Sequence, residues 1–454
     1  MTKKNDESRK GLSRRDFFKH ASMAAGGGLL LGSLPVGASA NVAASDLLKI
    51  AVVGCGGRGT GAANQALSTG DGVQLVAMAD AFRDRLDESF ERLSNRFEGT
   101  DKINVPEEHK FTGFDAYQKA IELADVVIFA TTPGFRPEHF ETAVNAGKHV
   151  FMEKPVATDV QGVRRVMEAG KVAEQKGLNV VVGLQRHYQN NYREVVKRVK
   201  NYAIGDIVSG QVYWNSGGVW VRERQPNQTE MEYQMRNWYY FNWLCGDHIL
   251  EQHIHNIDVA NWFIGEFPES AQGMGGREVR TGKDHGQIYD HHFVEFTYPS
   301  GAVIASQCRH QPNTMSRVDE VFQGTRGTVY TNSSNTGVLK TYGGRNIYDH
   351  NGEGDPNPYQ QEHDELFASI RSGRVINDTE QGAKSTMSAI IGRMATYSGK
   401  VIQWGEAMKS DHRLVPDSSQ LGWNVNPPVM PDTEGNYPIP VPGETDVLSP
   451  VTES

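Results

Sequence analysis

The sequence predicts an α/β protein of two domains: an N-terminal doubly wound parallel sheet and a C-terminal α/β domain with an open, mostly antiparallel sheet. Up to about residue 185, short apolar runs alternate with charged helical stretches, which is typical of parallel strands covered on both faces. From about residue 208, longer segments alternate polar and apolar residues, as antiparallel strands do. The 454 residues are too many for one ordinary domain and sufficient for two.

Four short apolar runs predict the strands of the parallel sheet, at residues 50–53, 73–79, 125–130 and 149–152. Charged stretches at residues 83–97 and 137–146 have the composition of helices, and Gly147 stops the second of them. We predict that this first domain covers residues 46–185.

The second domain is predicted over residues 186–410. Alternating segments predict long strands at residues 207–214, 292–298 and 302–307, and Pro299-Ser300-Gly301 predicts a hairpin turn between the last two. Helical patterns follow at residues 360–372 and 383–398. Residues 411–454 hold eight of the 19 prolines and show little periodicity. We expect them to form an extended tail that lies over the surface or over a partner subunit.

The first 40 residues have the pattern of a twin-arginine export signal. Ser13-Arg14-Arg15-Asp16-Phe17-Phe18-Lys19 precedes a weakly apolar, glycine-rich run and the small-residue sequence Ala38-Ser39-Ala40. An uncleaved membrane anchor is the alternative, but the apolar run is short and contains three consecutive glycines, whereas a spanning helix needs roughly 20 mostly apolar residues. We expect export, to the periplasm or otherwise out of the cytoplasm, followed by cleavage and no stable membrane insertion.

Net charge argues against one class of partner, and the cysteine content argues against a disulfide framework. Residues 1–40 hold seven basic and three acidic residues, so a whole-chain charge of −9 leaves −13 for the remainder. This acidity argues against nucleic acid as a partner. Three cysteines make no disulfide framework, which suits a protein that folds before export.

A glycine-rich loop predicts a dinucleotide site. Gly54-Cys55-Gly56-Gly57-Arg58-Gly59 follows an apolar run and opens a helical stretch, and Asp80 ends the next run, 21 residues after Gly59. Glycines permit the tight turn, the close approach of a pyrophosphate and the packing of helix on sheet. Asp80 can accept hydrogen bonds from the adenosine ribose, which favours NAD. Arg58 and Arg83 leave NADP as the alternative.

A second block carries a family resemblance. Ala146-Gly147-Lys148-His149-Val150-Phe151-Met152-Glu153-Lys154-Pro155 resembles the corresponding sequence of the glucose–fructose oxidoreductase and inositol dehydrogenase family (Gfo/Idh/MocA). The resemblance implies a Rossmann domain, a second α/β domain whose open sheet often supports oligomers, and a homo-oligomeric protein. The cofactor-binding residues that we predict are Gly54, Gly56, Gly57, Arg58, Gly59, Asp80, Thr132, Pro133, Glu153 and Lys154.

The family's Asp-x-x-x-His motif aligns with Glu251-Gln252-His253-Ile254-His255. The usual aspartate is Glu251 here, one methylene longer, and the usual small residue is His253. On one continuous helix, Glu251 and His255 at i, i+4 are neighbours.

Alcohol oxidation requires a group that removes the hydroxyl proton while hydride leaves the same carbon. Histidine suits this proton transfer because its pKa lies near the operating pH. We assign His255 as general acid/base, Lys154 as hydroxyl-binding partner or co-base, and Glu251 as the orienting residue, in place of the family's aspartate.

A metal centre is the alternative use of this histidine-rich segment. His248, Glu251, His253 and His255 lie close together in sequence, and His291-His292 follow later. Zinc hydrolases place ligands at i, i+4 on a helix, but the histidine spacings of five and two residues here match no zinc signature. We predict no metal.

Dense aromatic residues between 213 and 243 indicate a carbohydrate site, because flat apolar faces beside amides and guanidinium groups suit a sugar ring. Packing in the core or an interface is the alternative. We predict substrate contacts from Trp238 and Tyr239. The family resemblance implies Arg186 and His187 as further candidates, because they lie where the family's strand after the Glu153-Lys154-Pro155 unit delivers side chains to the cleft.

We expect a nicotinamide-dependent oxidoreductase acting on a secondary hydroxyl of a sugar, glycoside or cyclitol, with NAD(H) tightly bound and recycled in paired half-reactions. An NAD-dependent glycoside hydrolase or lyase, which oxidises the sugar transiently to permit elimination, is the alternative. A non-catalytic sugar-binding protein is the third hypothesis.

Overall fold

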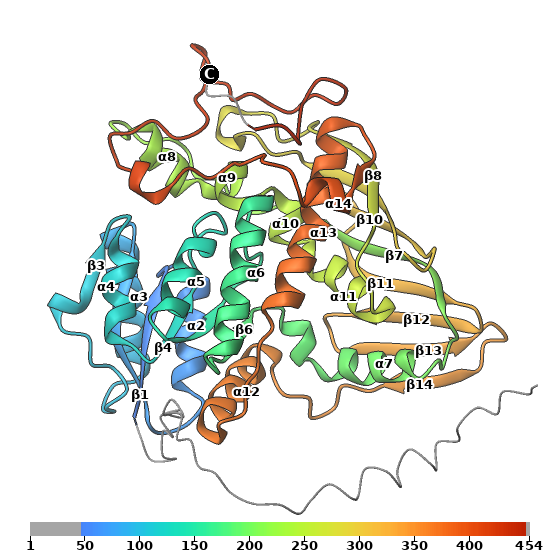
Figure 1. Cartoon of the computed structure of the whole chain (residues 1–454), viewed down its shortest axis with the longest axis horizontal. Helices are drawn as coiled ribbons and strands as arrows, with labels where there is room; N and C mark the ends of the chain where they lie inside the picture. The colour runs from blue at the N-terminus through green and yellow to red at the C-terminus, as the bar shows by residue number, and fades with distance from the viewer. Residues whose placement is uncertain (1–46, 451–454) are drawn as a thin grey trace, which may run out of the picture. The chain divides into compact units, whose positions relative to one another are not determined.

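The computed structural model describes residues 47–450, which contain two sheets (Figure 1). The first sheet is parallel and has six strands in the order β3-β2-β1-β4-β5-β6. The strands are β1 (Leu48–Val53), β2 (Val73–Asp80), β3 (Lys110–Thr112), β4 (Val126–Phe129), β5 (His149–Met152) and β6 (Val180–Val182). The helices that alternate with them are α2 (Gly57–Leu67), α3 (Arg83–Arg96), α4 (Ala116–Leu123), α5 (Arg136–Asn145) and α6 (Val160–Gln175).

The predicted parallel sheet is confirmed, and burial explains why its strands read as continuous apolar runs. All four residues of β4 are buried, because helices cover both faces of the sheet. The edge strands β3 and β6 have only three residues each, and neither is among the four strands predicted from apolar runs.

The second sheet has nine strands in the order β14-β13-β12-β11-β7-β10-β9-β8-β15 and is antiparallel except between β7 and β10. Its strands are β7 (Ile207–Ser216), β8 (Ser270–Gly276), β9 (His291–Thr297), β10 (Val303–His310), β11 (Arg317–Gly324), β12 (Gly327–Asn332), β13 (Thr336–Thr341), β14 (Asn346–His350) and β15 (Ile402–Gln403). The predicted mostly antiparallel sheet is confirmed, and residues 299–301 form the predicted turn between β9 and β10.

The helices of this part are α7 (Asn190–Lys200), α8 (Glu230–Arg236), α9 (Asn242–Cys245), α10 (His248–Glu251), α11 (Ile254–Ile264), α12 (Pro358–Ser372), α13 (Thr379–Ser398) and α14 (Trp404–Ala407). Helix α13 is buried nearly all around, because it packs on β8 and β9 and also against α6. One hydrophobic core therefore runs from Ala51 of the first sheet to Val447 near the end of the described chain. Helix α12, within the range predicted for the second domain, packs against α2.

The tail from residue 411 to residue 450 lies over the surface of its own chain, as the red trace above α8 and α9 indicates (Figure 1). Its one regular element is the 3-10 turn η5 (Ser418–Gln420). The backbone N–H of Leu414 donates to the Asp159 carboxylate over 2.7 Å, and the Gln234 amide donates to the Val429 carbonyl over 2.6 Å. These bonds tie the tail to helices of both parts of the chain.

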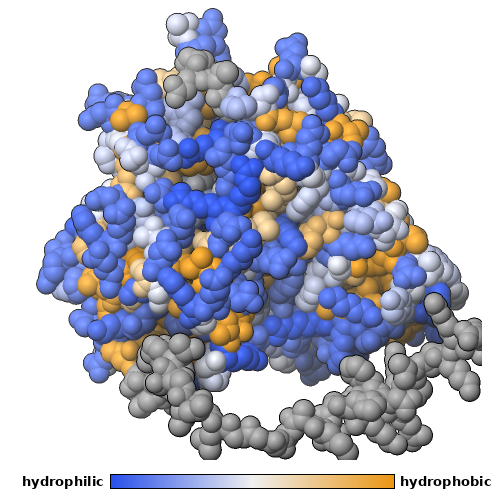
Figure 2. All heavy atoms as spheres, in the orientation of Figure 1, coloured by the Kyte–Doolittle hydropathy of each residue, from blue (hydrophilic) through white to orange (hydrophobic). Residues whose placement is uncertain are grey.

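The predicted export signal at residues 1–40 lies outside the described residues. Within residues 47–450, no helix has both the length and the apolar character needed to cross a membrane. Cys55, Cys245 and Cys308 are buried and unpaired, and burial raises the pKa of each thiol. The face drawn in Figure 2 is largely hydrophilic, with apolar side chains in scattered patches.

Candidate active site

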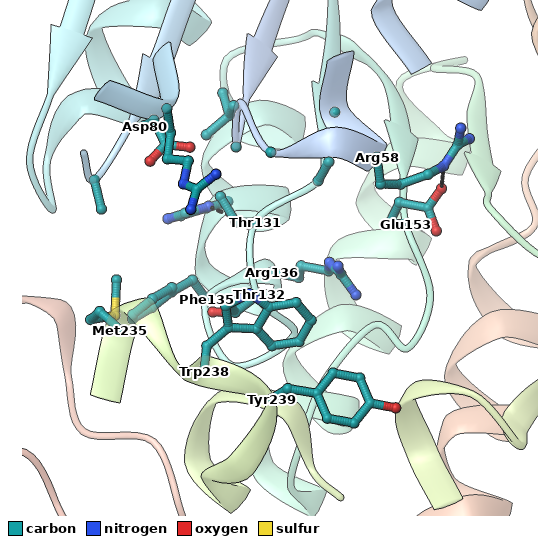
Figure 3. Close-up of a pocket in the computed structure, with 18 of the residues that line it drawn as sticks. Arg58, Asp80, Thr131, Thr132, Phe135, Arg136, Glu153, Met235, Trp238 and Tyr239 are labelled. Carbon is teal, nitrogen blue, oxygen red and sulfur yellow. Dashed lines mark hydrogen bonds and ion pairs between the residues drawn. The ribbon is translucent and has the colours of Figure 1, made fainter. Parts of the chain in front are cut away.

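A cavity of about 610 Å³ opens at the carboxyl ends of the parallel strands. Its lining includes the ends of β1 and β2, the residues that follow β4, β5 and β6, and side chains from the aromatic region and from α10 and α11. Figure 3 shows part of this lining, with Trp238 and Tyr239 on one side and Arg58, Asp80 and Glu153 near the strand ends. This is the edge at which doubly wound sheets bind ligands.

The glycine loop has the shape that a pyrophosphate needs. Gly54 has φ +95°, and a Cβ there would lie 2.5 Å from the backbone of Ala130. A Cβ on Gly59 would lie 1.8 Å from the Gly54 carbonyl oxygen, so only glycine lets α2 start this close to β1. A Cβ on Gly56 or Gly57 would meet nothing within 4 Å. Gly54 and Gly59 therefore shape the loop, whereas Gly56 and Gly57 leave its outer side open to an anion at the start of α2.

Asp80 is fixed beside this loop. Its carboxylate accepts the backbone N–H groups of Cys55, over 2.6 Å, and Phe82, over 2.9 Å. Burial raises the pKa of Asp80, and these two bonds oppose that rise. The carboxylate lines the cavity, where it can accept hydrogen bonds from a ribose diol.

Both arginines predicted as alternatives for a 2′-phosphate form ion pairs within the chain, although Arg58 lines the cavity. The Arg58 guanidinium donates to Glu153 (Figure 3) and lies 3.1 Å from Glu362. Arg83 pairs with Asp87 and Glu107 at the surface and does not line the cavity. Arg85 also lines the cavity, and its charge acts on Asp80; the sequence analysis missed this residue.

Replacing Asp80 with alanine is expected to weaken NADH binding by about 10- to 100-fold, because hydrogen bonds to charged groups contribute about 1.5–3 kcal/mol. NADPH binding should fall much less, since removing the carboxylate also removes its repulsion of a 2′-phosphate near Arg85. Fluorescence titration of both nucleotides measures this, with Glu91→Ala, an exposed residue of the following helix α3, as control. Equal losses for the two nucleotides would contradict the assignment.

Thr132 and Glu153 also line the cavity, and the Thr132 hydroxyl is buried without a hydrogen-bond partner. Pro133 is not among the lining residues. Its carbonyl accepts the Arg136 backbone N–H at the start of α5, so Pro133 shapes the turn behind the cavity.

Lys154, Glu251 and His255 meet in the cavity, although they come from different parts of the fold. Lys154 follows β5, and its ammonium group donates to the Glu251 backbone carbonyl and lies 3.5 Å from the Glu251 carboxylate. Burial raises the pKa of Glu251, while the Lys154 charge opposes the rise. Burial holds the pKa of His255 well below its usual value, and the Lys154 charge lowers it further, so this imidazole is neutral at pH 7.

The prediction that Glu251 and His255 share one continuous helix is wrong. Helix α10 ends at Glu251 and α11 begins at Ile254. Between them the His253 backbone N–H donates five residues back, to the His248 carbonyl, and the His255 N–H donates only three back, to Gln252. The His253 ring bonds Ser306 on β10 over 2.7 Å, which holds this break against the second sheet.

Arg186 and His187 do not line the cavity, which corrects their predicted substrate role. Arg186 is buried and paired with Glu320 of β11. The His187 ring lies 2.7 Å from the Asp258 carboxylate and stacks on Trp262 with 4.0 Å between ring centroids. These contacts fix the segment that begins the second part of the chain: Arg186 binds it to the second sheet, and His187 binds it to α11.

The aromatic region divides between cavity wall and core. Trp238 and Tyr239 line the cavity, as do Trp214 and Trp220, and the Tyr239 hydroxyl is buried without a hydrogen-bond partner. Tyr240, Phe241 and Trp243 do not line the cavity and are buried in an apolar cluster that also contains Tyr239. Tyr239 therefore belongs to the cavity wall and to the core, and the sugar contacts of Trp238 and Tyr239 remain a prediction.

Two further polar lining residues were missed: Arg136 belongs to no motif, and Gln252 occupies one of the unspecified positions between Glu251 and His255. Arg136 is buried at the start of α5, donates to the Pro155 carbonyl over 2.6 Å, and keeps its Nε without a partner. Gln252 lies in the break between α10 and α11, and its side-chain oxygen is 2.6 Å from His310 Nε2.

The described residues gather one group of potential metal ligands: Asp247, His248 and His292, whose ligand atoms lie within 4.8 Å of one another. It differs from the set weighed in the sequence. The Asp247 carboxylate accepts the His248 and Tyr289 backbone N–H groups and the Tyr397 hydroxyl, and lies 2.9 Å from His248 Nδ1. Protein donors therefore already surround this carboxylate.

Fold and site together define a dinucleotide-binding protein, and comparison with known proteins identifies its family. Residues 48–184 match the family model of the oxidoreductase family with an NAD-binding Rossmann fold, and residues 192–330 match the GFO/IDH/MocA C-terminal domain, together more than half of the chain. The chain belongs to the Gfo/Idh/MocA oxidoreductase family, and its first domain is of the NAD-binding type.

Curated relatives include dehydrogenases and a hydratase. The chain is 26% identical over 224 residues to 2,7-anhydro-N-acetylneuraminate hydratase of Escherichia coli (49% of this chain, 56% of that protein). It is 30% identical over 180 residues to inositol 2-dehydrogenase 3 of Saccharopolyspora erythraea (40% and 46%). The chain spans about half the length of the first curated relatives that it matches.

Solved structures share the fold. The aldose-aldose oxidoreductase of Caulobacter crescentus, complexed with glycerol, superposes with a TM-score of 0.61 at 19% identity over 79% of this chain and 99% of that one. The scyllo-inositol dehydrogenase of Lactobacillus casei with bound NAD(H) and scyllo-inositol has a TM-score of 0.60 at 20% identity, over 79% of this chain and all of that one.

Proposed function

We propose that this chain is an exported NAD-dependent oxidoreductase that acts on a secondary hydroxyl of a sugar, glycoside or cyclitol. The observation that carries the proposal is the meeting of Lys154, Glu251 and His255 in the cavity that the glycine loop also lines. The aromatic wall suits a carbohydrate ring, and the named relatives act on inositol or on an anhydro-sugar acid. Export rests on the twin-arginine sequence, and the acidic chain is proposed to work as a homo-oligomer without nucleic acid.

Residues of this chain account for the proton side of the reaction. Bound NAD⁺ supplies the acceptor for the hydride that leaves the carbinol carbon. Lys154 binds the hydroxyl oxygen, His255 takes the hydroxyl proton as the C=O bond forms, and Glu251 holds the lysine through its carbonyl and carboxylate. Outside the cytoplasm no soluble nucleotide pool replaces a lost cofactor, so we propose that a second carbohydrate carbonyl is reduced by the reverse steps.

Similarity to the anhydro-sugar acid hydratase favours one alternative. In that alternative, oxidation to a ketone acidifies the neighbouring C–H, a substituent is eliminated and replaced by water, and the hydride then returns, so the cofactor shows no net change. The same three residues would serve both outcomes.

One experiment separates the candidates. Purified protein is denatured and released NAD(H) or NADP(H) is measured, and native protein is incubated with p-nitrophenyl glycosides. Stoichiometric nucleotide without p-nitrophenol supports the oxidoreductase, whereas p-nitrophenol without net nucleotide reduction supports the hydrolase or lyase. Protein that neither holds nor binds nucleotide would leave only a sugar-binding role.

The lowered pKa of His255 predicts the pH dependence of oxidation. A general base must be unprotonated, and a lowered pKa keeps His255 so as the pH falls through 6.5. We expect kcat/KM for sugar oxidation to show no His255-dependent decrease between pH 7.5 and 6.5. An acid limb centred near pH 6.5, absent from His255→Asn at its residual rate, would contradict this.

A further inference from the structure

The C-terminal tail enters the wall of the cavity at a defined place. Ser418 and Leu421 line the cavity together with Phe114, Tyr117 and Glu138 of the first domain. The Ser418 hydroxyl donates to the Glu138 carboxylate over 2.5 Å. A segment more than 330 residues away in sequence from Asp80 thus completes the first domain's side of the cavity.

Aromatic packing fixes the tail at this place. The Trp423 ring centroid lies 4.7 Å from that of Phe114 and 5.1 Å from that of Phe82, and both phenylalanines line the cavity. Phe82 is two residues beyond Asp80 and donates its backbone N–H to the Asp80 carboxylate. The tail therefore covers the cavity beside the carboxylate that is placed to accept a ribose.

Anchors on both sides of Trp423 make this segment a strap. Before it, the Leu414 N–H donates to Asp159, and Asp417 and Gln420 close a reciprocal capping box around η5. After it, the Val429 carbonyl accepts the Gln234 amide, which comes from α8 of the second part. The strap thus spans from one part of the chain to the other across the cavity wall.

We propose that residues 411–430 form the outer wall of the adenosine half of the nucleotide site and slow the escape of a bound dinucleotide; this inference rests on the proposed function. Leaving the site requires the adenosine half to pass Leu421 and the wall of Phe82 and Phe114, which Trp423 holds in place from behind. A cofactor that is used and recycled outside the cytoplasm needs such retention. The nicotinamide half lies beyond the reach of these contacts, at Lys154 and His255.

Trp423→Ala tests the proposal. We expect NADH, followed by its nicotinamide fluorescence on chase with excess NAD⁺, to leave the variant at least tenfold faster than the wild type. Reduced nicotinamide mononucleotide, which lacks adenosine, should bind both proteins equally. Val425→Ala, an exposed position two residues further along the tail, is the matched control and should match the wild type. If Trp423→Ala does not fold, Leu421→Ala carries the same expectations, because it removes only a cavity-lining side chain.

Two outcomes for Trp423→Ala would overturn the proposed role of the strap. One is release of NADH within twofold of the wild-type rate. The other is an equal loss of affinity for NADH and for the mononucleotide, which would mean that the substitution damages the whole site. Wild-type protein that binds neither ligand would instead overturn the proposed function. The two failures are therefore distinguishable.

Discussion

Lys154→Ala is expected to retain bound nucleotide and to lose about 10²–10⁴-fold in turnover, the usual contribution of a positioned acid–base group. The lysine ammonium donates to the Glu251 carbonyl and faces its carboxylate, so removing it takes away both the hydroxyl-binding cation and the partner that Glu251 orients. Single-turnover oxidation of the enzyme-bound cofactor by candidate sugars measures the rate, and nucleotide released on denaturation measures retention.

Two further variants separate the role of the Lys154 charge from a general effect of removing a lysine. Lys171→Ala removes an exposed lysine of α6 that pairs only with Glu168, and it should turn over like the wild type. Lys154→Arg keeps the charge but cannot give up a proton, so recovery of most of the rate would show that the charge is the main contribution. Unchanged turnover in Lys154→Ala would refute the assigned role.

Glu320→Ala is expected to destabilise the fold by about 3–5 kcal/mol, the usual result of breaking a buried ion pair from one side. Glu320 and Arg186 are both buried, and the carboxylate also accepts the Tyr192 hydroxyl over 3.0 Å, the Asn256 amide over 2.6 Å and the Thr331 hydroxyl over 2.8 Å. The substitution leaves the arginine charge without its partner. Denaturant unfolding followed by circular dichroism measures the change in the free energy of unfolding.

The double variant Arg186→Met/Glu320→Leu is the decisive control. It removes both charges, so it should recover a large part of the stability that the single variant loses. Glu168→Ala, which breaks the exposed pair with Lys171, should cost at most about 1 kcal/mol. A cost below 1 kcal/mol for Glu320→Ala would mean that Arg186 finds other compensation.

Local sequence features predicted the first domain well because they have local causes. Gly59 is required by the carbonyl oxygen of Gly54 in the same loop, and the loop is continuous in sequence. The apolar run that became β4 is buried on both faces and therefore has no polar alternation. Lys154 follows β5 directly, so predicting that strand also predicted where the lysine emerges.

The features that could not be predicted from the sequence depend on contacts between residues far apart in the chain. Nothing near Arg186 in sequence indicates that Glu320, 134 residues later, neutralises it in the core. The break between α10 and α11 follows from a bond between His253 and Ser306 of another strand, so helical periodicity alone misplaced Glu251 relative to His255. The tail shows no helical or strand periodicity in its sequence because contacts with the surface of the rest of the chain set its conformation.

Because both sheets share one apolar interior, we expect that the two parts of the chain cannot fold separately. Cutting the chain between β6 and α7 would expose α6 on one fragment and the facing side of α13 on the other. Neither fragment would be an autonomous unit, and heat or denaturant should melt the protein in a single cooperative step. Exchange of the nucleotide half with that of a relative would succeed only if the residues that meet α13 were exchanged with it.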